Sequence, residues 1–220
     1  MLKTSLFLSL LIFSSLFSES CNRFGKEPQP EPIPVVLDKS HGVLLGVTLD
    51  STNAYDLTNL LGQDQPVLLK VEGREDSTHG PFVYCYYSKT SPSIRVSFWT
   101  GGSEDPVVYK YILKESDQPD EKECSGSSSI DKNVKTGGGV TIGMSRSEFL
   151  NLFPGKPQVS GDTVRYQYEK FEKYQVPIPT NWNPDVQYTG EWHSSWVEGI
   201  FNNKKLKKYS LEMGGEMEWD

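Results

Sequence analysis

The stretch Gly143-Met144-Ser145-Arg146-Ser147-Glu148-Phe149-Leu150-Asn151-Leu152-Phe153-Pro154-Gly155 carries the start and stop signals of a short helix. Ser145 and Glu148 have the spacing of a capping box, in which each side chain binds a backbone N–H that the helix start leaves open. Phe149, Leu152 and Phe153 fall on one helical face. Pro154 and Gly155 then end the helix. The stretch predicts a short helix packed through its apolar face.

Strand patterns follow this helix. Residues 164–168 alternate apolar and polar side chains, as a half-buried strand does. Residues 196–201 and 206–213 flank the turn Asn202-Asn203 and predict a closing hairpin. The hairpin carries four lysines, interpreted either as a basic patch or, preferably, as protection of an edge strand: Lys204, Lys205, Lys207 and Lys208.

A looser copy of the same pattern lies upstream, from Gly46-Val47-Thr48 to Leu60-Leu61-Gly62. Asp50, Ser51 and Thr52 offer N-caps there, and leucines recur at helical spacing before Gly62. The strands expected after this copy are residues 67–71, 82–87, 94–99 and 107–113. The two copies predict an α+β fold of two tandem units, each a short helical element packed on a small antiparallel β-sheet.

The unit boundaries follow from composition. We place unit 1 at residues 35–116, a linker at 117–136 and unit 2 at 137–220. The acidic run 115–123 lacks the alternating oxygen ligands of a calcium loop, and the glycines at 137–139 precede an extended segment where a phosphate loop needs a helix. Both runs are interpreted as solvated connections.

The first twenty residues are predicted to be a bacterial lipoprotein signal peptide. Lys3 precedes an apolar run, Leu6 to Phe17, which is too short for the roughly 20 residues that a bilayer requires. Ser18-Glu19-Ser20 then precedes Cys21, which resembles a lipoprotein box and makes Cys21 the lipid-carrying residue. The alternative is an ordinary cleavage site followed by a plain cysteine. Residues 21–34 carry prolines at alternate positions and predict an extended tether.

Cysteine and histidine usage limits the chemistry. The chain has 3 cysteines, so lipid on Cys21 leaves Cys85 and Cys124 available for a disulfide in an oxidising compartment. The three histidines have no metal-ligand spacing and are interpreted as surface or loop residues: His41, His79 and His193. We therefore expect no metal and no cofactor.

An aromatic insert, residues 174–195, separates the first strand of unit 2 from its hairpin. Its prolines argue against a central strand. The aromatic residues are interpreted either as core folding back on itself or as a contact surface, because Trp and Tyr dominate binding hot spots. The candidate partner-binding residues in and beside the insert are Trp182, Tyr188, Trp192 and Trp196. The candidates on the solvent side of the strands of unit 1 are Tyr84, Tyr86 and Trp99.

The Gly-Met-Ser start, the capped helix ending in Pro-Gly and the closing hairpin resemble the SmpA/BamE-like outer-membrane lipoproteins and are similar to the tandem units of the β-lactamase inhibitor protein (BLIP) family. This resemblance implies two α+β units whose exposed face or loops bind another protein. The upstream copy departs from the pattern because no Glu completes its capping box. The inhibitor family tends to carry a disulfide within each unit, whereas only Cys85 and Cys124 are available here. Because of these two differences, no binding residues are carried over from either family.

The functional expectation is a lipid-anchored protein of the bacterial cell envelope, at the outer membrane, that binds another protein without catalysis. A net charge of −7 argues against nucleic acid as a partner, and no known catalytic motif is present, so neither an enzyme nor a small-molecule substrate is expected. An inhibitor of an envelope or secreted hydrolase is the alternative, and an enzyme of unknown type is a third class.

Overall fold

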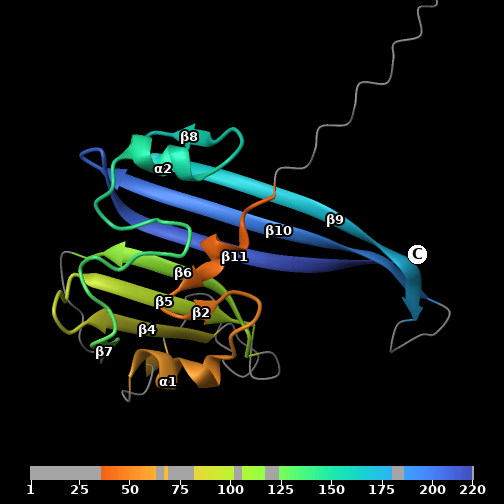
Figure 1. Cartoon of the computed structure of the whole chain (residues 1–220), viewed down its shortest axis with the longest axis horizontal. Coiled ribbons are helices and arrows are strands. Elements are labelled where there is room, and N and C mark those ends of the chain that lie inside the picture. The colour runs from red at the N-terminus through yellow and green to blue at the C-terminus, as the bar shows by residue number, and fades with distance from the viewer. Residues whose placement is uncertain are drawn as a thin grey trace, which may run out of the picture. The chain divides into compact units, whose positions relative to one another are not determined.

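Three long strands of the second half of the chain dominate the computed structural model. β9 (Thr163–Pro179), β10 (Gln187–Asn202) and β11 (Lys205–Trp219) form an antiparallel meander (Figure 1). The first half contributes a second meander, β4 (Phe82–Ser88), β5 (Ile94–Thr100) and β6 (Val108–Glu115). The structure describes residues 36–62, 67–68, 82–101, 106–116, 124–179 and 186–219, so the predicted signal peptide, Cys21, the tether, His79 and Trp182 lie outside the described residues.

The prediction of two α+β tandem units is wrong. β6 pairs with β11 over Lys208–Glu212, which joins the two meanders into one sheet. With the short strands β3 (Val67–Leu68), β7 (Ser125–Ser127) and β8 (Gln158–Ser160), this sheet has nine strands, in the order β3-β4-β5-β6-β11-β10-β9-β8 with β7 parallel to β4. The described part of the fold is therefore mostly β.

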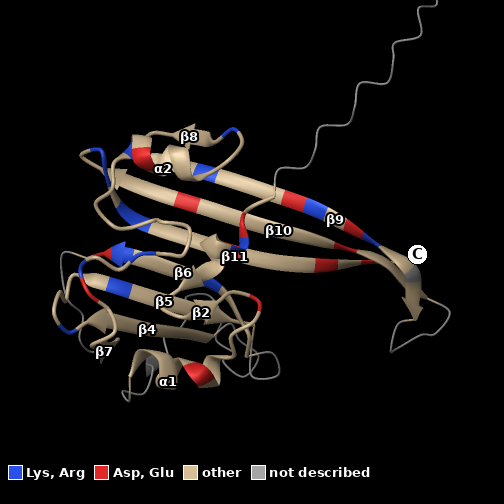
Figure 2. Ribbon diagram, in the orientation of Figure 1, with Lys and Arg blue, Asp and Glu red and all other residues tan. Residues whose placement is uncertain are grey.

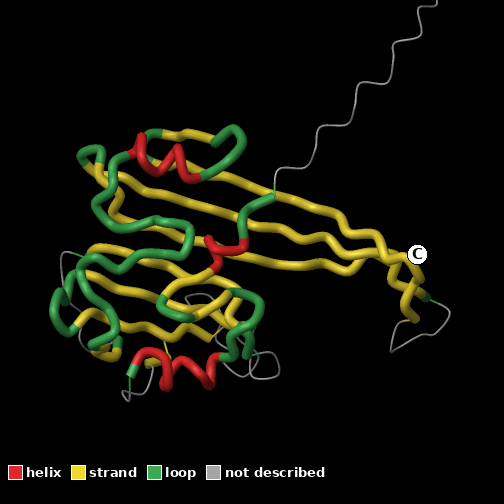
Figure 3. Tube along the Cα trace, viewed as in Figure 1, coloured by secondary structure: helices red, strands yellow, loops and turns green. Residues whose placement is uncertain are grey.

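Helices are short and few in the described ranges (Figure 3). They are α1 (Leu57–Leu61) and α2 (Arg146–Leu152), with the 3-10 turns η1 (Lys39–Gly42) and η2 (Ala54–Asp56). The capping box of α2 is confirmed: Glu148 N–H donates to Ser145 Oγ at 3.2 Å, and Ser145 N–H donates to Glu148 Oε2 at 2.7 Å. Phe149 is fully buried beneath this helix. The local sequence signals predicted this helix correctly, but they did not indicate that both halves of the chain share one sheet.

In the described residues the insert at 174–195 is strand over 174–179 and 187–195, so it continues β9 and β10 and does not separate the first strand from the hairpin. β9 continues to Pro179 and β10 resumes at Gln187, and the two pair through Ile178 and Tyr188. β8 stops pairing with β9 at Arg165, so the rest of β9 is an outer strand. An edge strand has one row of N–H groups without ladder partners, and proline is tolerated there for this reason.

The hydrophobic core lies on one face of the sheet. Tyr111 and Tyr209, both fully buried, meet at the β6–β11 junction with ring centroids 5.8 Å apart. Three segments cover this face and cross in front of the strands in Figure 1. They are the hairpin of β1 (Val43–Leu44) and β2 (Val47–Thr48), the turn η1, and residues 128–145. One continuous core therefore serves both halves of the chain.

His41 is a core residue, which corrects its assignment to the surface. Its side chain is buried and packs against Phe153, with the two rings tilted and their centroids 4.7 Å apart. Gly138 lies against the imidazole, and a Cβ at this glycine would be 2.1 Å from His41 Nδ1. The glycine run at residues 137–139 is thus a site of close backbone approach. Burial lowers the pKa of His41.

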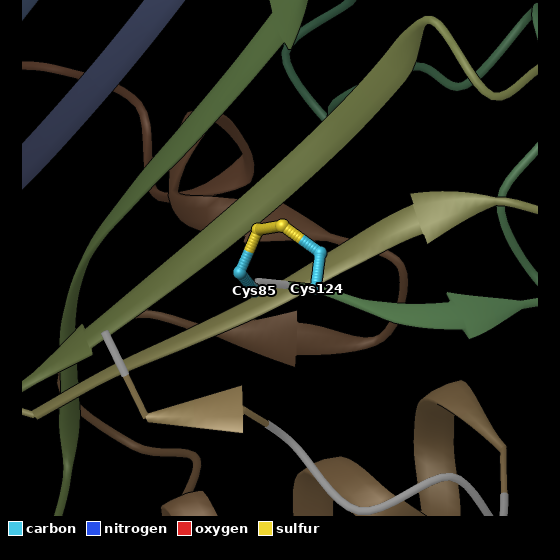
Figure 4. The surroundings of a disulfide bond; sticks show 2 residues. All are labelled: Cys85 and Cys124. Atoms are coloured by element: carbon cyan, nitrogen blue, oxygen red, sulfur yellow. A yellow bond between two sulfur atoms is a disulfide. The ribbon is translucent and has the colours of Figure 1, made fainter. Parts of the chain in front are cut away.

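Cys85 and Cys124 are joined by a disulfide, with Cα atoms 4.6 Å apart (Figure 4). Cys85 lies on β4, and Cys124 directly precedes β7, which pairs with the same strand. The bridge therefore fastens the start of β7 to β4. None of the helices in the described residues is long and apolar enough to cross a membrane.

Candidate functional site

The face of the sheet opposite the core, called here the outer face, carries exposed aromatic and charged side chains. Successive strand residues point to opposite faces, so buried Val197 and exposed Trp196 of β10 lie on different sides. On β9 the buried residues Tyr166 and Tyr168 alternate in the same way with exposed Gln167. The outer face is open from β6 across to β9. It is covered at β4, where Cys85 and Cys124 are buried.

Five residues form a row across five strands of this face, called here the tryptophan row. Each is the direct cross-strand partner of the next: Trp99, Lys110, Glu212, Trp196 and Gln167. Lys110 Nζ lies 2.7 Å from Glu212 Oε2 and 5.3 Å from the centre of the Trp99 ring. The row therefore connects tryptophans from both halves of the sequence through an ion pair and a cation–π contact.

A second row beside it completes a shallow hollow. Glu198 receives two cations there: Arg165 at 2.8 Å and Lys208 at 3.4 Å. These contacts and the hydrogen bond from Arg165 hold the pKa of Glu198 below its usual value, against the effect of its partial burial. The two rows line a hollow of about 250 Å³ with Trp196 in its wall. Paired charges around an exposed indole are the composition of an interface rim around a hot spot.

An aromatic pair extends the surface along β10. Trp192 lies four residues before Trp196 on the same face, and both side chains are 40% exposed. Phe171, the direct partner of Trp192 on β9, contacts it with ring centroids 4.9 Å apart. Trp192 Nε1–H donates to Glu218 Oε2 at 3.0 Å. The indole is thereby oriented while its ring stays exposed.

The predicted contact residues divide between the two faces. Trp192, Trp196 and Trp99 lie on the outer face. Tyr86 is buried in the core and Tyr84 packs beside it on the same face, so the choice of these two as contact residues is corrected. The alternation in β4 had been assigned the wrong way round. Tyr188 is half-buried near the end of β10, and Trp182 lies outside the described residues.

Three residues of the outer face were missed by sequence reasoning: Phe171, Lys110 and Glu212. Phe171 was within reach, because it is the next outer-face position after Arg165, Gln167 and Glu169. Lys110 and Glu212 belong to different halves of the chain, and no local pattern indicates that β6 and β11 are neighbours. The four lysines of the last hairpin include Lys207 and Lys208, which form ion pairs with Glu115 and Glu198 within the sheet.

A larger hollow of about 430 Å³ lies between residues 36–51 and the middle of β9, β10 and β11. Several polar side chains lie close together there: Lys170 lies 3.0 Å from Glu172, and His193 lies 3.9 Å from Glu172 and 3.8 Å from Glu191. In the part of the chain that the structure describes, no hydrogen bond joins His193 to a serine hydroxyl, and no cluster of three metal-ligating side chains occurs.

No family model, curated protein or solved structure matches this chain. The resemblance to the SmpA/BamE-like lipoproteins and the BLIP family remains a prediction from the Gly143–Gly155 motif.

Proposed function

We propose that this chain is a lipid-anchored protein of the bacterial cell envelope, at the outer membrane, that binds another protein through its outer face and performs no reaction. The anchor is Cys21, and the tether at residues 21–34 holds the sheet away from the bilayer. The partner is a protein because the exposed groups are indoles surrounded by paired charges, the composition that protein hot spots favour.

The tryptophan row is the observation that supports this proposal best. Trp196 exposes 40% of its surface in the middle of a sheet face, where a monomeric domain gains nothing from an exposed indole. The ion pair between Lys110 and Glu212 links the two strands that lie between Trp99 and Trp196. A rigid surface loses little conformational entropy on binding, which favours association.

The test is capture of partners from native envelope extracts by the full-length protein. We expect Trp196→Ala and Trp192→Ala, singly and together, to reduce recovery of the specific partner at least about tenfold, the loss of a hot-spot residue. Tyr55→Ala is the matched control, because Tyr55 is 71% exposed on η2, away from the outer face. Folding of each variant is checked by near-UV circular dichroism. Equal recovery by all variants would reject the outer face as the binding surface.

The anchor is tested separately. Intact-mass analysis of the protein from its native envelope is expected to show cleavage before Cys21 and added acyl mass on that residue. Cys21→Ser is expected to release the protein into the soluble fraction. A mature protein without acyl mass would remove the lipid anchor from the proposal and leave the binding face untouched.

A further inference from the structure

The outer edge of β11 is open over its last residues. β6 pairs with β11 only as far as Glu212. β6 then turns away because the backbone of Val108 bonds instead to residues 50–52: Val108 N–H donates to Thr52 O, and Asp50 N–H donates to Val108 O. Among the described residues no strand pairs with the outer edge of Met213–Trp219. With respect to the described residues, seven residues of edge, about 23 Å long at 3.3 Å per residue, are therefore unpaired.

The other outer strand of the same meander is protected and β11 is not. β9 carries Pro177 and Pro179 near its end and charges of both signs, including Lys170 and Lys173. Proline and lysine are devices that natural edge strands use against added strands. Residues 212–219 of β11 contain neither. The open edge of β11 is suited to accept a strand.

The charges beside this edge are all acidic. Between Leu211 and Trp219 the charged residues are Glu212, Glu216 and Glu218, which share the outer face of β11. In Figure 2 the projecting part of β11 is tan with red bands, whereas β9 carries both red and blue. Self-pairing of two β11 edges would bring these carboxylates together, which is unfavourable. Complementary charge points to a basic segment.

A glycine opens the edge toward Trp196. Gly214 lies on the outer face between Glu212 and Glu216, and a Cβ placed on it would be 3.5 Å from Cζ3 of Trp196. A residue of an added strand directly opposite Gly214 therefore meets no side chain before the indole. An arginine there would stack on Trp196 between Glu212, which is paired with Lys110, and Glu216.

We propose that the partner of the outer face contributes an extended basic segment that adds as a further strand to β11 at Met213–Trp219. Arginine or lysine side chains of that segment alternate on the outer face, one opposite Gly214 against Trp196 and another opposite Glu216. The larger hollow reaches Met213 and Gly214, at the start of this edge. This inference rests on the proposed function and specifies how its partner is recognised.

The test uses the full chain and a blocked seven-residue peptide that alternates arginine with valine, measured by calorimetry and amide hydrogen exchange. Binding is expected to slow exchange of amides within Met213–Trp219. Two further peptides carry N-methyl groups on one or the other set of alternate amides, and one of them is expected to bind at least about tenfold more weakly, because a backbone hydrogen bond is lost. A peptide that alternates glutamate with valine is expected not to bind.

Variants locate the contact. Glu216→Gln is expected to weaken the arginine peptide about two- to fivefold, the size of a cross-strand charge pair. Glu191→Gln is the matched control, because it removes the same charge from the opposite face of the neighbouring strand. Gly214→Val is expected to weaken binding by a similar factor by covering Trp196, while valine keeps the strand stable.

Three results would overturn the inference: equal binding of both N-methylated peptides, no slowing of exchange at β11, or equal loss in Glu216→Gln and Glu191→Gln. If sedimentation analysis shows a dimer, and Gly214→Val abolishes that dimer, then a second copy of this chain occupies the β11 edge and the basic segment does not. In each case the proposed function is judged separately: if Trp192→Ala and Trp196→Ala still reduce capture of the native partner, the outer face remains the proposed binding surface.

Discussion

Lys110 and Glu212 form an ion pair of 2.7 Å across the β6–β11 boundary, although 102 positions separate them in the sequence. The side chains are 25% and 36% exposed, so water screens the attraction. We expect a double-mutant cycle with Lys110→Gln and Glu212→Gln to give a coupling of about 0.2–1 kcal/mol in urea unfolding at low salt. The coupling should shrink in 1 M NaCl, where the Debye length falls to about 3 Å. A coupling that is insensitive to salt would show that the pair acts through packing.

Gly199 of β10 allows Phe149 of α2 to rest on the sheet. A Cβ at Gly199 would lie 2.8 Å from Cζ of Phe149, whose ring is fully buried. We therefore expect Gly199→Ala to lower the free energy of unfolding by about 1–3 kcal/mol, the cost of overpacking. Gly214→Ala is the matched control, because its nearest contact is at 3.5 Å, and its effect should stay within about 0.5 kcal/mol. Equal effects in urea unfolding would contradict this packing.

His41 makes stability depend on pH. Burial lowers its pKa below the ordinary value of about 6.5, so the unfolded chain binds the proton more readily than the native protein does. The free energy of unfolding should therefore fall as the pH drops below about 6.5 and level off below the native pKa. His41→Gln removes this titration, so the difference between wild type and variant should move in favour of the variant between pH 7 and pH 5. His79 and His193 are common to both proteins and cancel. A constant difference across this range would place His41 in water.

The disulfide between Cys85 and Cys124 spans 39 positions. In the chain-entropy model, closing a loop of this size stabilises the fold by about 4 kcal/mol. We expect replacement of both cysteines by alanine, or reduction, to lower the urea midpoint by a corresponding amount. Cys21→Ser is the control that keeps the disulfide and should leave the midpoint unchanged. If the alanine variant were as stable as the wild type, the bridge would have no part in holding residues 124–127 against β4.

The local elements followed from the sequence because their signals are local. The capping box of Ser145 and Glu148 stands in the structure as the spacing predicts. β9 also follows the alternation predicted for residues 164–168, whereas β5 is buried on both faces except at Trp99. Alternation does not say which of its two faces is buried, and for this reason Tyr84 and Tyr86 were placed on the exposed side.

The sequence by itself determined the short α2 helix, the strand-forming segments and the pair of cysteines available for a bridge. Only the tertiary structure decided that both meanders share one sheet, since pairing β6 with β11 depends on backbone hydrogen bonds between residues about a hundred positions apart. That pairing also placed Trp99 and Trp196 in one row and left the end of β11 open. Backbone groups carry no sequence signature of their partner, so the outer face became visible only once the strands were in register.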